Sequence, residues 1–168
     1  TALSPLHRVG HQLVEALRIH RDLDKKEAWQ TGTEWLDKVG IPDADERMYN
    51  YPFQFSGGMR QRAMIAMALM LEPALIIADE PTTALDVTIQ AQIFDLILNM
   101  KSRDTSLLLI THDMGVIWEM CDRVVVMYAA KVVEEGPIHK IFQTPKHPYT
   151  QSLLKSVPRL HQKCDRLE

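Results

Sequence analysis

Apolar and polar positions alternate with a helical period through the N-terminal part of the chain. Val9, Leu13 and Leu17 recur at the spacing of a helix with one apolar face. Asp24 and Glu27 form the pattern of a reciprocal cap at the start of a second helix. The segments that this pattern predicts as helical are residues 9–20, 25–39 and 44–48. This part of the chain is therefore predicted to be all-helical.

The pattern changes after Gly58. Residues 59–71 are strong helix formers and apolar around most of the circumference, which predicts a largely buried helix. Short continuous apolar runs then alternate with amphipathic stretches. The predicted strands are residues 74–78, 106–110 and 123–127, and the predicted helices are residues 87–100 and 114–120. This alternation predicts a parallel α/β sheet whose strands are covered on both faces.

The C-terminal part is expected to begin with a hairpin. Ala129 and Ala130 separate the strand at 123–127 from a further strand at 131–134, although tight hairpin turns usually take Gly or Asn. Turns that contain proline then separate two short predicted helices, at residues 138–142 and 149–156.

Composition narrows the classes of function. The 168 residues are 46% hydrophobic and carry a formal net charge of −3, so a core is expected and a positive field that attracts nucleic acid is not. No apolar run approaches the roughly 20 residues of a membrane-spanning helix. Cys121 and Cys164 are far apart and have no metal-binding spacing, which favours a reducing compartment. A globular cytoplasmic protein without a nucleic-acid partner is expected.

Two adjacent carboxylates, Asp79 and Glu80, follow the apolar run at 74–78. The carboxyl end of a parallel strand is where α/β proteins bind ligands, and consecutive strand side chains point in opposite directions. Asp79 is suited to hold Mg²⁺, and Glu80 is suited to orient a water for attack on phosphorus. The same pattern also fits a strand that ends in a solvated acidic turn.

Ser56, Gly57 and Gly58 precede a predicted helix. The free N–H groups and positive dipole end of such a helix start can bind a phosphate, and Ser56 can cap the helix or offer its hydroxyl to the anion. His112 follows the strand at 106–110 and can donate a hydrogen bond to a phosphate oxygen near the two carboxylates. An ordinary cap and an ordinary surface histidine are the alternatives.

These motifs occur in a fixed order, namely FSGGM at residues 55–59, Asp79-Glu80, ALD at residues 84–86, and His112. With these motifs in this order, the chain resembles the nucleotide-binding subunit of ABC transporters. The four motifs match, in turn, that family's signature motif, its Walker B strand with the following glutamate, its D-loop and its switch histidine. The resemblance implies an α/β fold, a partial P-loop NTPase (ABC ATPase) fold, with a parallel sheet and a helical subdomain at the N-terminal end.

The segments FSGGMRQR and HPYTQSLL are further similar to the ATPase subunits of dipeptide and oligopeptide importers. The ATPase subunits of importers of nickel, glutathione and other small solutes share much of this sequence. Such an importer is therefore an alternative. The resemblance implies three parts: a helical signature subdomain at residues 1–58, the C-terminal part of the ATPase core at 59–135, and a C-terminal extension of the peptide-importer type at 136–168.

The resemblance also implies cofactors and residue roles. ATP and Mg²⁺ are the expected cofactors. The turn Ser56–Gly58 would contact ATP held mainly by a second ATP-binding subunit, and Asp86 would lie at the seam between the two subunits. Asp79 would hold the metal, while Glu80 and His112 would act as catalytic residues on the chain's own ATP.

Integral-membrane permease subunits are the other partners that the resemblance implies, with a solute-binding protein as an indirect one. The expected location is the cytoplasmic face of the inner membrane, as a peripheral subunit. Trp29, Trp35 and Tyr51 are candidate contacts for the permease, although both tryptophans also fit a core position.

No G-x-x-x-x-G-K-[ST] phosphate loop occurs in the 168 residues. The chain, which begins at Thr1, is therefore expected to be a fragment that is inactive alone, although the complete subunit would be a transport-coupled ATPase. A non-catalytic interaction piece is one alternative. A soluble cassette protein of DNA repair or translation is another, which the HPYT wording disfavours.

Overall fold

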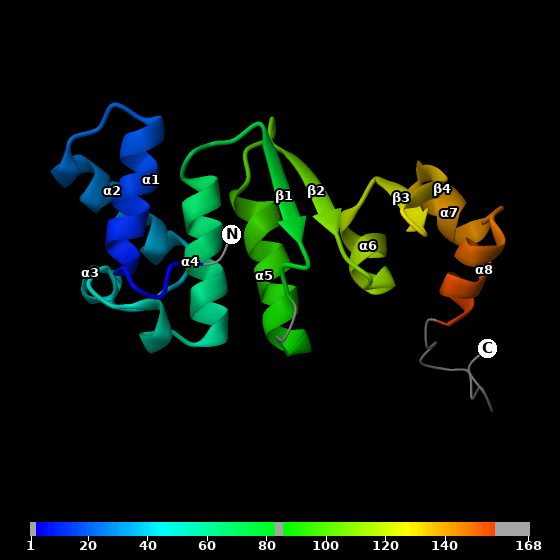
Figure 1. Cartoon of the computed structure of the whole chain (residues 1–168), viewed down its shortest axis with the longest axis horizontal. Coiled ribbons are helices and arrows are strands. Elements are labelled where there is room, and N and C mark those ends of the chain that lie inside the picture. The colour runs from blue at the N-terminus through cyan, green and yellow to red at the C-terminus, as the bar shows by residue number, and fades with distance from the viewer. Residues whose placement is uncertain (1–2, 83–85, 157–168) are drawn as a thin grey trace. The chain divides into compact units, whose positions relative to one another are not determined.

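The computed structural model describes residues 3–82 and 86–156, in two compact units that comprise residues 1–108 and 109–168 (Figure 1). The first unit contains α1 (Val9–His20), α2 (Lys25–Lys38), α3 (Ala44–Arg47), the 3₁₀ turn η1 (Pro52–Gln54), α4 (Gly57–Leu69), β1 (Leu75–Asp79) and α5 (Val87–Met100). The strand β2 (Ser106–Ile110) spans the boundary. The second unit contains α6 (Met114–Met120), β3 (Arg123–Tyr128), β4 (Lys131–Pro137), α7 (Ile138–Gln143) and α8 (Pro148–Lys155).

The core of the first unit lies between α1, α2 and α4. Leu13, Leu17 and Leu36 are fully buried there. Gly10 brings α1 close to the chain at the end of α3, because a Cβ at this position would lie 2.6 Å from the carbonyl oxygen of Met48. The predicted N-terminal helices are confirmed.

The predicted reciprocal cap of α2 is also confirmed. Asp24 Oδ1 accepts hydrogen bonds from the N–H groups of Lys26 (2.7 Å) and Glu27 (2.8 Å), and Glu27 Oε2 accepts one from the Asp24 N–H (2.9 Å). In the described part of the chain, no helix combines enough length with enough apolar character to cross a bilayer.

β1 and β2 pair as neighbours in a two-stranded sheet and run parallel. The prediction that both faces of these strands are covered is wrong for the described residues. Leu75, Ile77 and Leu108 are 52%, 62% and 49% exposed, whereas Ala78 is buried. The described elements therefore cover one face of this sheet, and the apolar run reflects a second face that they leave open.

β3 was predicted as a third strand of the parallel sheet, and this prediction is wrong. Instead it pairs with β4 in a separate antiparallel sheet, with Val125 opposite Glu135 and a register shift after Val126. The predicted hairpin is confirmed. Ala129 and Ala130 both have positive φ, 48° and 61°, which is the backbone that a tight two-residue hairpin requires and which usually favours Gly or Asn.

Glu134 on β4 ties the HPYT segment to the hairpin. Its carboxylate oxygens accept hydrogen bonds from the backbone N–H groups of Lys146 (2.8 Å) and His147 (3.0 Å). His147 Nδ1 then caps α8 by accepting from the Tyr149 N–H at 3.2 Å. The Tyr149 ring packs on that of Tyr128 with 4.5 Å between centroids. These residues therefore position the start of α8.

The Lys146 backbone N–H lowers the pKa of the Glu134 carboxyl from its ordinary value, with smaller contributions from the nearby Thr150 hydroxyl and from His147. Because the folded pKa is depressed, the stabilisation is present above the ordinary value of 4.5 and is lost as the pH falls through the folded pKa.

We predict that Glu134→Ala lowers the hydrogen-exchange protection of the Lys146 and His147 N–H groups by roughly threefold to tenfold at neutral pH, because two charge-assisted hydrogen bonds are lost. The unmodified chain should show the same loss only below pH 4.5. Glu135→Ala, which changes the exposed neighbour, is the matched control. Equal protection factors in the two variants would contradict this role of Glu134.

Candidate functional site

The start of α4 carries the predicted anion-binding turn. Ser56 has extended backbone angles, and its Oγ accepts a hydrogen bond from the Met59 N–H at 3.2 Å. The predicted cap is thereby confirmed. Within the described residues, no group accepts a hydrogen bond from the N–H of Gly57 or Gly58, the first two helical positions. Two amide donors are therefore available to an anion at the positive end of the helix.

Arg60 holds the chain that leads into this turn. Its Nη1 donates to the carbonyl oxygens of Phe55 (2.9 Å) and Pro52 (3.5 Å), which belong to η1 and its end. Phe55 is only 3% exposed and anchors the turn in the core. The sequence pattern did not identify Arg60 as part of the site. A cation in the first turn of a helix, where acids are favoured, was the available signal.

Arg62 joins α4 to two other helices, and the sequence pattern did not identify this residue either. Its Nη1 donates to the Val39 carbonyl oxygen at the end of α2 (2.7 Å), and its Nη2 donates to Gln92 Oε1 on α5 (3.0 Å). Gly40 makes room for this arrangement. It has a φ of 75°, and a Cβ on it would lie 3.1 Å from Arg62 Nη1.

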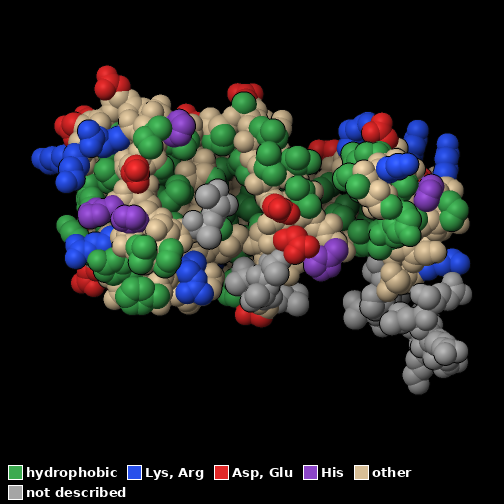
Figure 2. All heavy atoms as spheres, in the orientation of Figure 1, with side chains coloured by type: hydrophobic (Ala, Val, Ile, Leu, Met, Phe, Trp, Pro, Cys, Tyr) green, Lys and Arg blue, Asp and Glu red, His purple; other side chains and the backbone are tan. Residues whose placement is uncertain are grey.

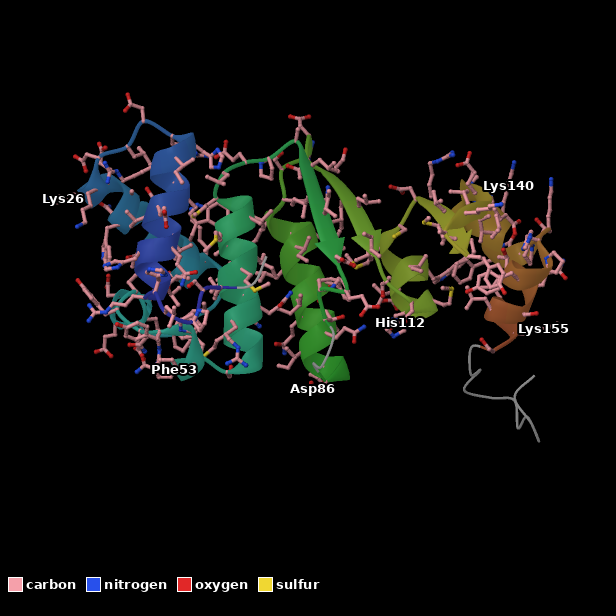
Figure 3. All side chains as sticks on the ribbon, in the orientation of Figure 1. Lys26, Phe53, Asp86, His112, Lys140 and Lys155 are labelled. Atoms are coloured by element: carbon pink, nitrogen blue, oxygen red, sulfur yellow. The ribbon has the colours of Figure 1, made fainter. Side chains whose placement is uncertain are left out.

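The start of α5 lies beside the start of α4. A Cβ on Gly58 would lie 3.3 Å from Ile89 Cγ2, so Gly58 permits this close approach. Asp86 caps α5 by accepting from the Ile89 N–H at 2.9 Å, as predicted, and it is labelled at that end of the helix in Figure 3. Ala84 and Leu85 of the ALD motif lie outside the described residues.

Asp79 and Glu80 lie at the carboxyl end of β1, both exposed. Figure 2 shows acidic side chains on the surface where β1 ends. Glu80 is already outside the strand and has a φ of 42°. A residue other than glycine in this region stores backbone strain of about 1–3 kcal/mol, and such residues cluster at functional sites. The direction of the Glu80 side chain is therefore set by the turn that follows β1 and not by the alternation of side chains along a strand.

His112 lies between β2 and α6, in the second unit, and is exposed. The helix that follows is capped as predicted, since Asp113 Oδ1 accepts from the N–H groups of Gly115 (2.9 Å) and Val116 (3.2 Å). Because Asp79 and Glu80 belong to the first unit, the closeness of His112 to the two carboxylates stays a prediction.

The donor set agrees with the Mg²⁺ and the phosphate that the sequence implies. In residues 3–82 and 86–156, no three His, Cys, Asp or Glu side chains gather as a dedicated protein metal site would need. Mg²⁺ bound with phosphates needs only one or two carboxylates. The exposed carboxylate of Asp79 satisfies that need, and the Gly57 and Gly58 N–H groups fit a phosphate oxygen.

Comparison with known proteins adds the family. A profile described as "ABC transporter" matches residues 3–83, and one described as "Oligopeptide/dipeptide transporter, C-terminal region" matches residues 133–168. The dipeptide transport ATP-binding protein DppD of Bacillus subtilis is 57% identical, and the oligopeptide transport ATP-binding protein OppD of Salmonella typhimurium is 52% identical, each over 95% of this chain. The chain spans about half the length of these curated relatives, 48% of each.

A solved structure described as the ATP binding subunit of an ABC transporter has the same fold. It aligns with a TM-score of 0.67 and 26% identity, over 83% of this chain and 57% of that chain. The profile that matches residues 3–83 includes the capped turn at Ser56 and the acidic end of β1. The chain therefore belongs to the ABC transporter family, with a partial ABC ATPase fold and the C-terminal region of the oligopeptide/dipeptide transporters.

Proposed function

We propose that the chain is part of an ATP-hydrolysing subunit that energises the import of peptides or similar small solutes. The observation that carries the proposal is the start of α4, where Ser56 caps the helix and the Gly57 and Gly58 N–H groups can meet a phosphate. The names of the relatives, dipeptide and oligopeptide transport ATP-binding proteins, support the solute class. Import of nickel or glutathione is the alternative for the same site.

ATP would supply the phosphoryl group, and Mg²⁺ would neutralise charge on its phosphates. Ser56–Gly58 donates hydrogen bonds to the terminal phosphate of a nucleotide held by a second ATP-binding subunit. Asp79 would hold the metal on the chain's own nucleotide, and Glu80 would orient the attacking water and accept its proton. His112 donates a hydrogen bond to a terminal phosphate oxygen. Asp86 lies at the seam between the two subunits.

The helices before α4 would transmit conformational changes at the nucleotide site to integral-membrane permease subunits. A solute-binding protein would be an indirect partner. Arg62 supports this proposal because it ties the end of α2 to both α4 and α5. Trp29, Trp35 and Tyr51 are partly buried, so each keeps some surface for a contact. Such a subunit would be peripheral, at the cytoplasmic face of the inner membrane.

We predict that Glu80→Gln, in a subunit that contains these residues together with a phosphate loop, slows ATP hydrolysis by roughly 10²-fold or more and leaves ATP binding intact, since Gln cannot accept the proton of the water. Phosphate release and nucleotide binding are measured separately. Glu72→Gln is the matched control, because Glu72 is also an exposed glutamate with positive φ, 50°. Unchanged turnover in Glu80→Gln would contradict the proposed role.

We predict that Arg60→Gln in the same subunit lowers kcat about tenfold, because the turn before Ser56 loses its hold and the phosphate donors are displaced. The affinity for the subunit's own nucleotide should not change, since Arg60 acts on the turn that serves the second site. Arg18→Gln, an exposed arginine on α1, is the control. If Arg60→Gln lowers kcat and nucleotide affinity equally, Arg60 acts through general stability.

The non-catalytic alternative is favoured by one observation, the missing G-x-x-x-x-G-K-[ST] sequence within the 168 residues. We predict that these residues alone, titrated with Mg-ATP, release no phosphate, because the loop that holds the β- and γ-phosphates is not among them. Measurable hydrolysis that Glu80→Gln abolishes would show that the 168 residues suffice.

A further inference from the structure

An open groove of about 1080 Å³ lies against α1, α2 and α3, in the first unit, and its lining does not include the residues proposed to bind phosphate. Its apolar floor is formed by Trp29 of α2 and by Tyr49, which follows α3, with His11 of α1 beside them. Figure 3 labels Lys26 at the end of α2 that borders the groove.

The aromatic floor is fixed in place and accessible. The Trp29 and Tyr49 ring centroids are 5.0 Å apart at 45°, and His11 meets Trp29 edge-on at 6.1 Å. The Trp29 ring packs so closely on α1 that a Cβ on Gly10 would lie 3.0 Å from its Cη2 atom. Tyr49 is nonetheless 56% exposed. The groove therefore offers a packed aromatic surface that a ligand can reach.

Charge around this floor is uneven. Four carboxylates line the groove against two lysines: Glu34, Asp37, Asp43 and Asp45 against Lys25 and Lys26. Asp43 has a φ of 55° and precedes α3 without capping it by its side chain. The Asp43 carboxylate therefore accepts no capping hydrogen bond from the start of α3, although an aspartate in this position usually does. No three such acids gather as a metal site would need in the described part of the chain, so the charge suits an extended cationic partner.

The neighbouring aromatic surfaces differ from this one. Lys38 Nζ lies 5.2 Å from the centroid of the Trp35 ring, and the Arg8 guanidinium carbon lies 5.9 Å from that of Tyr51. Among the described residues, no lysine or arginine occupies the corresponding place over Trp29 or Tyr49. Within the part of the chain that the structure describes, Trp35 and Tyr51 thus each have a cation of the chain over the ring, whereas Trp29 and Tyr49 have none in that position.

We propose that this groove docks an arginine-bearing segment of a partner protein. A planar guanidinium stacks on an aromatic face and forms paired hydrogen bonds with carboxylates, which a lysine ammonium cannot do equally well. Trp29 and Tyr49 provide the aromatic face, and Asp43 and Asp45 provide the carboxylates. The docking involves no nucleotide, so it goes beyond the proposed ATPase role and stands if that role fails.

The test uses the 168-residue chain and a helical alanine-based peptide with three arginines on one face. Binding is followed by NMR at the Trp29 indole N–H, which Trp29→Phe assigns. We predict that the arginine peptide causes a saturable shift of this signal. A peptide with lysine in place of each arginine should bind at least fivefold more weakly. A peptide with citrulline in place of each arginine should cause no shift, because citrulline keeps the shape of the side chain and loses its charge.

Asp43→Asn combined with Asp45→Asn should weaken binding at least fivefold without unfolding the chain, since Asn tolerates the left-handed backbone of Asp43. Asp95→Asn, an exposed carboxylate on α5 outside the groove, and Trp35→Phe are the matched controls. Equal binding by the citrulline peptide, or by the double Asn variant, overturns the proposal. Equal effects of spermine, or shifts that depend on protein concentration alone, assign the groove to small polycations or to a second copy and also overturn it.

Discussion

The guanidinium of Arg62 is the interaction on which the first unit depends, because it joins three helices through one side chain. It closes the end of α2 by donating to Val39 and reaches α5 through Gln92. Gly40 is needed beside it for both its φ of 75° and the space it leaves. The helix that presents the Gly57 and Gly58 amides is thus fixed to the helices before it and to the helix after it. A displacement at the start of α4 must move or break these bonds.

The sequence predicted the helix starts well, because capping is local chemistry. Asp24, Ser56, Asp86 and Asp113 each accept backbone hydrogen bonds where the pattern places a helix start. Long-range features were not predictable in the same way. The turn at Ala129 and Ala130 predicted the pairing of β3 with β4, but the alternation of strands and helices wrongly placed β3 in the parallel sheet, since membership of a sheet depends on which segments meet in space. The open face of β1 was missed because an apolar run records what a strand can bury, not what covers it.

The reactive groups of the candidate site could be predicted from the sequence, but the residues and backbone angles that position them could not. Glu80 follows from its place after an apolar run, but its φ of 42° does not. The sequence around Arg60 is typical of an exposed helix face, yet the Arg60 guanidinium donates a hydrogen bond to the carbonyl oxygen of Phe55, which precedes the helix. Side chains that act on the backbone of a preceding turn leave no periodic signal. They become visible only when the chain's path around them is known.

The HPYT wording, which carries much of the resemblance to peptide importers, has a structural explanation in this chain. His147 caps α8, Tyr149 packs on Tyr128, and Glu134 holds the turn before them. Each of these contacts is made within the second unit, between the hairpin and its last helix. A motif whose side chains are engaged in this way identifies a C-terminal region by its fold.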